Sequence, residues 1–237
     1  MPHHSDFSFE VLGRNSVQDS WNGQPTSLLK DQNLNMPQTP DGTMILAATN
    51  QATENNQGTL AITSGGSQPE FPNIPALANE PTIFIENYHA NNLSLTNISA
   101  NDNTPILVQG VGPGIPGINP QNLTTQEPVT LTPGQAAQGN ASPQYMQLVF
   151  TSTTPTLGVV GLIGGPLDKD NNNGYVIAVN ATSNTGPGTG NEPPPGYYAT
   201  TTSNAYTYAF NWGSSTIFVS NLSPSTANPV QVTLRAL

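Results

Sequence analysis

The sequence predicts an all-β protein, a β-sandwich of the jelly-roll or Ig-like kind with long Pro/Gly-rich loops and an extended N-terminal arm. Short runs in which apolar and polar residues alternate recur along the 237-residue chain, bounded by turn residues. Thr, Val, Ile, Tyr and Phe dominate these runs, as suits a half-buried pleated surface. No stretch of the sequence carries a 3.6-residue apolar stripe over three helical turns. Many short strands separated by frequent turns are typical of a sandwich or a barrel.

The alternating runs predict strands throughout the chain. In chain order they lie near residues 7–12, 43–48, 58–63, 82–87, 93–98, 105–109, 128–132, 145–151, 157–163, 175–181, 197–202, 205–211, 216–221 and 230–235. Two of the turns have a clear mechanism. Asn173-Gly174 suits a turn whose two central residues have positive φ. Thr132-Pro133-Gly134 suits a type II turn at the end of the strand before it.

Segments rich in Pro and Gly divide the chain. Residues 1–40 are expected to form a partly extended arm that orders on a neighbouring molecule, as segments that fold on binding do. Residues 41–237 are expected to form the β-sandwich. A linker or long crossover at 64–81 gives a possible boundary within it. Two further long loops are expected at 110–120 and 185–196, where long irregular loops are usually functional or mobile.

Two segments of the sequence echo each other. Thr82–Asn87 and Thr216–Asn221 both read as short apolar strands that end in Asn, and each precedes a second alternating run. We interpret this as convergence of strand composition, with two related β units as the alternative.

The stretch 82–151 resembles a generic Ig-like β-sandwich pattern. The resemblance rests on an Ile-rich strand ending in Asn, a Val-Thr-Leu-x-Pro-Gly turn and a later alternating strand, which here are Thr82–Asn87, Val129–Gly134 and Met146–Thr151. It covers under a third of the chain and implies a fold at most, since a fold does not fix a function.

The charge of the chain excludes whole classes of partner. Four Lys and Arg stand against 14 Asp and Glu, giving a formal net charge of −10, and charged residues make up only 8%. Nucleic-acid binding requires several cations to displace counterions from phosphates, so we expect no nucleic-acid partner. An anionic membrane surface is disfavoured for the same reason, and no run of residues is long and apolar enough to span a bilayer.

The start of the chain and its cysteine content bear on location. The first residues, Met1–Asp6, are polar and acidic, unlike a secretion signal, and the chain holds no cysteine for disulfides or thiolate sites. The body of the chain is poor in Lys and suits an exposed, protease-resistant surface. We therefore expect a virion or extracellular-surface protein that is made in the cytoplasm.

One acidic segment suggests calcium chemistry. Asp168, Asp170 and Asn172 place oxygen atoms at the alternate positions that an EF-hand loop uses for its first ligands. The match then fails, because Asn173 stands where the loop needs Gly and Val179 where it needs a bidentate Glu. We expect a solvated hairpin loop here, with a Ca²⁺ site as the alternative. Light scattering with and without Ca²⁺ distinguishes the two if assembly depends on the ion.

Aromatic residues gather near the C-terminus. Tyr206, Tyr208 and Phe210 alternate along one predicted strand, and Trp212 continues the series. Period-2 spacing places them on one face, where aromatic residues belong more often to a core than to a ligand site. Tyr197 and Tyr198 follow a Pro-rich loop and are expected to be the better exposed pair. A carbohydrate site would use Tyr197, Tyr198 and Trp212.

Catalytic motifs are not evident, so we expect a protein that is not an enzyme and needs no cofactor. His89 is the one candidate base for a Ser-His-Asp triad, and no Gly-x-Ser-x-Gly elbow accompanies it. Scattered carboxylates could pair for glycoside hydrolysis, but solvated carboxylates at strand ends are the simpler interpretation. Several Asn-x-Ser/Thr sequons are interpreted as chance in a chain this rich in those residues.

Two hypotheses about function follow. The first is a structural protein that self-assembles, such as a virion capsid or decoration subunit or a protomer of a surface layer or filament, with itself or other coat subunits as partners. A low-charge, amide-rich surface offers little repulsion against self-association. The alternative is a lectin-like module that binds a carbohydrate or a receptor.

Overall fold

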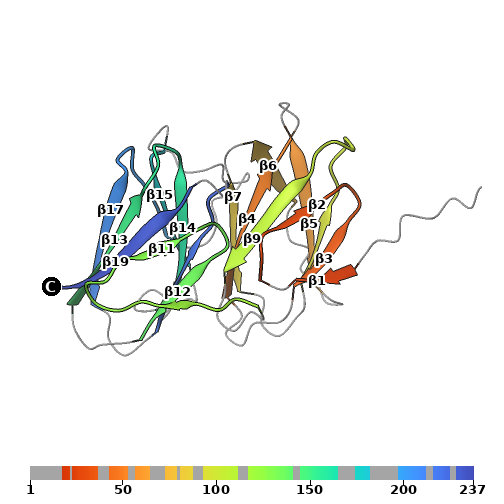
Figure 1. Cartoon of the computed structure of the whole chain (residues 1–237). Helices are drawn as coiled ribbons and strands as arrows, with labels where there is room; N and C mark the ends of the chain where they lie inside the picture. The colour runs from red at the N-terminus through yellow and green to blue at the C-terminus, as the bar shows by residue number, and fades with distance from the viewer. Residues whose placement is uncertain are drawn as a thin grey trace, which may run out of the picture.

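A computed structural model of the chain shows four layers of β-strands stacked side by side (Figure 1). The structure describes residues 18–21, 23–36, 43–52, 57–64, 73–78, 81–87, 93–111, 117–140, 145–164, 174–181, 197–211, 216–224 and 228–237. Within these residues every regular element is a strand, and the predicted all-β sandwich is confirmed.

The first two layers belong to one nine-stranded sheet that folds over at β6. Layer 1 contains β1 (Gln18–Ser20), β3 (Asn33–Met36), β8 (Leu93–Asn97), β5 (Gly58–Ser64) and β6 (Ile74–Ala78). Layer 2 contains β2 (Thr26–Leu28), β9 (Ile106–Val111), β4 (Thr43–Asn50) and β7 (Thr82–Asn87). Strand β6 joins the layers because it pairs antiparallel with β5 and parallel with β4.

Layers 3 and 4 are separate sheets. Layer 3 contains β10 (Gln121–Asn122), β12 (Ala136–Gly139), β18 (Ile217–Asn221), β14 (Gly158–Gly164), β15 (Tyr175–Val179) and β16 (Tyr197–Thr200). Layer 4 contains β11 (Val129–Leu131), β19 (Val230–Ala236), β13 (Tyr145–Ser152) and β17 (Ala205–Asn211).

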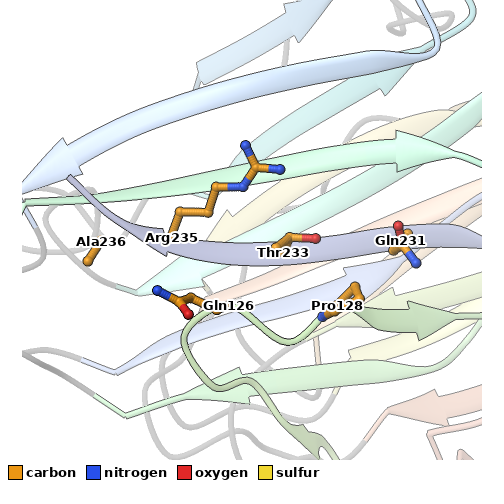
Figure 2. Close-up of a pocket in the computed structure, with 6 residues that line it drawn as sticks. All are labelled: Gln126, Pro128, Gln231, Thr233, Arg235 and Ala236. Carbon is orange, nitrogen blue, oxygen red and sulfur yellow. The ribbon is translucent and has the colours of Figure 1, made fainter.

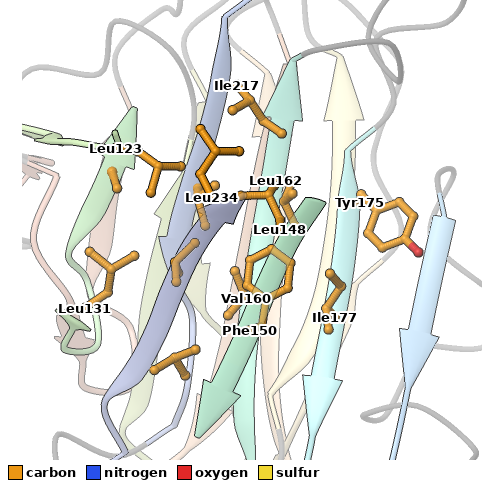
Figure 3. Packing of buried hydrophobic residues seen from close by; sticks show 14 of the residues in the cluster. Leu123, Leu131, Leu148, Phe150, Val160, Leu162, Tyr175, Ile177, Ile217 and Leu234 are labelled. Atoms are coloured by element: carbon orange, nitrogen blue, oxygen red, sulfur yellow. The ribbon is translucent and has the colours of Figure 1, made fainter. Parts of the chain in front are cut away.

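Three apolar cores fill the spaces between the four layers. Strand β14 illustrates how the middle layers serve two of them: Val160 and Leu162 face layer 4 (Figure 3), whereas Val159 and Ile163 face layer 2. Period-2 alternation therefore places apolar side chains on both faces of the strand. By contrast, β13 alternates between buried and half-buried residues, so layer 4 has one face in a core and one face open to solvent.

The chain contains the same strand arrangement twice. In unit 1 (residues 18–111) the order β1-β3-β8-β5-β6 lies across from β2-β9-β4-β7. In unit 2 (residues 117–237) β10-β12-β18-β14-β15 lies across from β11-β19-β13-β17. Layer 3 is thus equivalent to layer 1, and layer 4 to layer 2. The two segments that echo each other in the sequence, β7 and β18, are not equivalent, because β7 corresponds to β17 and β18 corresponds to β8. Their likeness is convergence of strand composition, and the two related units are shown by the strand order instead.

A fully buried asparagine closes each unit at the same place. In unit 1, the side-chain amide of Asn97 donates to the carbonyl oxygens of Leu28 (2.8 Å) and Thr104 (2.9 Å). Its side-chain oxygen accepts from the backbone N–H of Ser99 (3.0 Å). The Ser99 hydroxyl in turn accepts from the N–H of Thr59 at the start of β5 (3.0 Å). One amide side chain thereby joins four segments of the unit.

Unit 2 repeats this network group for group. The amide of Asn221 donates to the carbonyl oxygens of Leu131 (2.7 Å) and Asn228 (2.9 Å). Its oxygen accepts from the N–H of Ser223 (2.9 Å), whose hydroxyl accepts from the N–H of Val159 in β14 (2.9 Å). Both asparagines begin an Asn-x-Ser sequon, and both are fully buried. These two sequons therefore have a structural role and are not accessible for modification in the folded chain.

The turn beside each asparagine is also conserved between the units. The Gln32 side chain accepts from the N–H of Leu29 (2.8 Å), as Gln135 accepts from Thr132 (2.9 Å). The residue before each glutamine has positive φ, 64° at Asp31 and 83° at Gly134. Agreement in side-chain bonds and in backbone conformation at matching positions indicates a tandem duplication.

Most predicted strands are present within one or two residues of the expected ends, among them β4, β5, β7, β13 and β17. Six strands of the structure lie outside the predicted runs: β1, β2, β3, β6, β10 and β12. The first three lie within residues 1–40, the predicted arm, and β6 lies within the 64–81 segment. The predicted strand at 7–12 and the Asn173-Gly174 turn involve residues outside the described part. The division of the chain into an arm and one domain stays a prediction.

Replacing Asn221 by Ala should destabilise the protein strongly. The change leaves two buried carbonyl oxygens without donors, which costs about 3 kcal/mol of unfolding free energy. Urea unfolding followed by circular dichroism measures the loss, and Asn97→Ala should give a loss of similar size. The exposed Asn122, in β10, supplies the control, because Asn122→Ala should change stability little. Equal stability of Asn221→Ala and Asn122→Ala would contradict the closing role of the buried residue.

Candidate functional site

The outer face of layer 1 is covered by neutral polar side chains. Along β3, β8 and β5 the residues that alternate with the core are Asn33, Asn35, Ser94, Thr96, Thr59, Ala61 and Thr63. They are half-buried or exposed, and none is charged. The amide of Asn33 donates to the hydroxyls of Ser94 (2.6 Å) and Thr96 (2.9 Å), which links β3 to β8 on this face.

The outer face of layer 4 has the same character. Its positions on β13, β17 and β19 are Tyr145, Gln147, Val149, Thr151, Ala205, Thr207, Ala209, Gln231, Thr233 and Arg235. Arg235 stands at the end of β19 and is the one charged side chain among them. Typical protein surfaces carry about a quarter to a third charged residues. Both ends of the four-layer stack therefore present nearly uncharged sheet faces.

A hollow of about 440 Å³ lies at the edge of the outer face of layer 4 (Figure 2). It is lined by Gln126, Pro128, Gln231, Thr233, Arg235 and Ala236. Figure 2 shows the β19 side chains on one side and those of the 126–128 loop on the other. Amide, hydroxyl and guanidinium groups make it a polar site that offers hydrogen-bond donors and one positive charge.

Four large apolar side chains remain exposed among the described residues: Leu29, Ile98, Tyr145 and Leu237. Ile98 follows β8 of layer 1, and Leu29 lies in the turn between β2 of layer 2 and β3 of layer 1. The other two belong to layer 4, where the N–H of Leu237 donates to the carbonyl of Tyr145 (3.1 Å).

The aromatic series on β17 belongs to the core between layers 3 and 4, as the sequence predicted. Phe210 is buried, and Tyr206 and Tyr208 are half-buried against the same cluster. The Tyr208 ring lies 4.8 Å from Tyr175 and stacks on Phe210 at 5.2 Å between centroids. Register explains the placement, because Tyr206, Tyr208 and Phe210 pair with the inward-facing Phe150, Leu148 and Met146.

The other predicted site residues fall wholly or partly outside the described structure. The backbone of Tyr197 and Tyr198 lies in β16 opposite Tyr175 and Val176, but the placement of their side chains is not described. Trp212 lies outside the described residues. So do the possible calcium ligands Asp168, Asp170 and Asn172, and His89. The carbohydrate and calcium sites therefore remain predictions.

The described part of the chain offers neither a metal-binding cluster nor a membrane-spanning helix. Its His, Asp and Glu residues form no group of three or more that could hold a metal ion. No helix in that part is long and apolar enough to cross a membrane. Lys30 pairs with Asp102 at 3.0 Å, whereas Arg235 faces solvent at the hollow.

Comparison with known proteins gives weak structural likeness alone. No protein-family model matches the chain, and no curated protein matches it. The CUB1-EGF-CUB2 domain of human MASP-1/3 is similar over 93% of this chain and 98% of its own, with 11% identity and a TM-score of 0.24. A chain of Broad Bean Stain Virus is similar over 99% of this chain and 95% of its own, with 10% identity and a TM-score of 0.26. At these scores neither likeness carries an argument about function.

Sequence reasoning missed the hollow and the two outer faces. Gln231, Thr233 and Arg235 alternate along one run, so their common face was visible in the sequence. That Gln126 and Pro128 complete the hollow depends on the pairing of β11 with β19, which local patterns do not reveal.

Tyr208 should act as a core residue. Tyr208→Ala removes a ring that packs against two others and should lower the unfolding free energy by about 2 kcal/mol, less than for a fully buried aromatic residue. Tyr208→Phe keeps the ring and is the matched control. Thermal or urea unfolding measures both changes. A Tyr208→Ala protein as stable as the wild type would favour a ligand-binding role for the ring.

Proposed function

We propose that this protein is a non-enzymatic structural subunit that self-assembles, such as a virion capsid or decoration subunit or a protomer of a surface layer or filament. Its partners are copies of itself or other coat subunits, and its place is a virion or an extracellular surface. The observation that carries the proposal is the pair of nearly uncharged outer faces at opposite ends of the layered stack.

The physical support is the low cost of covering such faces. Burying a charge without a partner costs a large desolvation free energy. Neutral hydroxyl and amide groups cost less to desolvate, and they can form hydrogen bonds across a contact. Asp31, Asp102 and Glu127 lie in turns and loops and not within the strands of the two faces. Among the described outward positions of β3, β5, β8, β13, β17 and β19, Arg235 is the one charged side chain, so these strands offer little charge to repel a neighbour.

A carbohydrate- or receptor-binding module is the second candidate. The polar hollow favours it, because Gln126, Gln231, Thr233 and Arg235 offer the donors and acceptors that a sugar or a carboxylate requires. The described residues that line the hollow include no aromatic ring, and the predicted stacking side chains of Tyr197, Tyr198 and Trp212 lie outside the described structure. A glycan-binding screen addresses this candidate directly.

Self-assembly predicts a concentration-dependent mass. Light scattering should show species well above the 24.9 kDa chain, growing as the protein concentration rises. Val149, at the centre of the outer face of layer 4, pairs with Thr207 and Thr233 on its two sides. Val149→Lys should shift assembly to at least tenfold higher concentration, because a lysine there must lose water on contact.

Thr202→Lys supplies the matched control. Thr202 is exposed in the turn between β16 and β17, so the same charge there should leave assembly unchanged. A wild-type chain that stays monomeric at every concentration would contradict the proposal and turn attention to glycan binding. Equal effects of the two lysines would show that net charge, not the outer face, controls association.

A further inference from the structure

Because the strand arrangement occurs twice, each of the two sheet faces that pack together between the units has an equivalent face that is left uncovered at an end of the stack. Inside the molecule, the outward side of layer 2 packs against the outward side of layer 3 through Ile45 and Ala47 on one side and Val159 and Phe218 on the other. Layer 4 is equivalent to layer 2, and layer 1 to layer 3. The chain therefore ends in two surfaces whose equivalents already bind each other within it (Figure 1).

We propose that layer 4 of one copy packs on layer 1 of the next copy, in the arrangement that layers 2 and 3 have within the chain. This inference rests on the proposed self-assembly and names its partner and its two contact surfaces. The contact joins two different surfaces, so it is heterologous, and repetition gives an open filament or a closed ring.

The hollow on layer 4 corresponds to a place that is filled within the chain. The amide of Gln109 donates to the carbonyl of Ser223 across the contact between the units (2.8 Å), and Gly134 lies against the ring of Pro25. In unit 2, Thr233 stands at the position of Gln109, and Pro128 at that of Pro25. Both line the hollow. The hollow is thus the counterpart of the surface that receives layer 3 in unit 1.

Two exposed residues at the layer 1 end, Ile98 and Asp31, would meet the layer 4 face of a neighbouring copy. Leu222, at the contact between the units, is completely buried, whereas its equivalent Ile98 is 43% exposed. Asp31 is equivalent to Gly134 and is also exposed. A neighbouring copy placed by the internal arrangement would cover Ile98 and bring the Asp31 carboxylate toward Arg235. The two opposite charges would then meet. Among the described residues, Arg235 has no ion pair within its own chain that would compete with this contact.

The contact between copies must be looser than the internal one. A Cβ atom at Gly134 would lie 2.4 Å from Pro25, so Asp31 requires the next copy to sit farther from Pro128. The faces are also polar where the internal contact is apolar, with Gln147 and Thr207 at the positions of Ile45 and Ile83. Both differences favour a reversible association over a permanent one.

The charge distribution disfavours a contact between two unit 1 ends. Residues 1–116 carry ten acidic and two basic residues, whereas residues 117–237 carry four acidic and two basic residues. Two unit 1 ends would repel each other, while a unit 1 end meeting a unit 2 end faces far less charge.

Mixing two variants, each blocked on one face, tests the arrangement. Ile98→Lys blocks the layer 1 end and Thr233→Lys blocks the layer 4 end, and each variant alone should stay monomeric by light scattering. An equimolar mixture should form a dimer of twice the chain mass and nothing larger, because one matching pair of faces remains. Asn140→Lys, at an exposed site beyond β12, is the control and should assemble like the wild type.

The outcomes separate the two proposals. If the wild type assembles but the mixture stays monomeric, the head-to-tail contact is wrong and self-assembly stands. If either variant alone forms the dimer, like faces meet and the contact is wrong. A monomeric wild type overturns both.

A milder pair of variants keeps the test valid if a lysine prevents folding. Asp31→Asn and Arg235→Gln remove the two charges, and asparagine tolerates the positive φ at position 31. Each single change should raise the concentration needed for assembly several-fold. The double variant should need about the same concentration as the more strongly affected single variant, because both changes remove the same contact. Full additivity would exclude a contact between these residues.

Discussion

The structure depends on the requirement that an apolar sheet face be covered. Strands β14, β15 and β18 carry apolar residues on both faces, so layer 3 cannot end a sandwich and needs a sheet on each side. Layer 2 has the same need through Ile45, Ala47 and Ile83. The two units therefore have to pack together, and the burial of these faces holds the stack in one piece. Only layers 1 and 4 have a polar face, and for that reason they stand at the ends.

Local alternation was enough to place strands such as β13 and β19, whose apolar residues are large and whose outward residues are polar. It failed for β3, β6 and β12 for different physical reasons. Strand β3 has asparagines on its outward side, which are common in turns. Pro75 interrupts β6, and β12 consists of small residues with Gln138. These strands exist because neighbours supply the pairing: β8 for β3, β5 for β6 and β18 for β12.

The duplication was hidden for a related reason. The two units share few side chains in their cores, and Trp21 of unit 1 stands where unit 2 has Leu123. What they share is the hydrogen bonding of the backbone, where a buried amide or hydroxyl has few substitutes. Asn97 and Asn221, each followed by x-Ser, were present in the sequence as a signal. They were interpreted as chance sequons because sequence alone does not show that their amides are buried and satisfy carbonyl oxygens.

The same divergence links fold to assembly. Positions that carry Ile45 and Ile83 on layer 2 carry Gln147 and Thr207 on layer 4, so equivalent faces of the two units form an apolar internal contact in one case and a polar outer face in the other. A surface that needed only to remain soluble would be free to acquire Lys and Glu, as ordinary surfaces do. The layer 4 face instead carries neutral amides and hydroxyls at positions where layer 2 has isoleucines. Such a face is hydrated when it is free, and the contact proposed above would cover it without burying an unpaired charge in its strands other than Arg235.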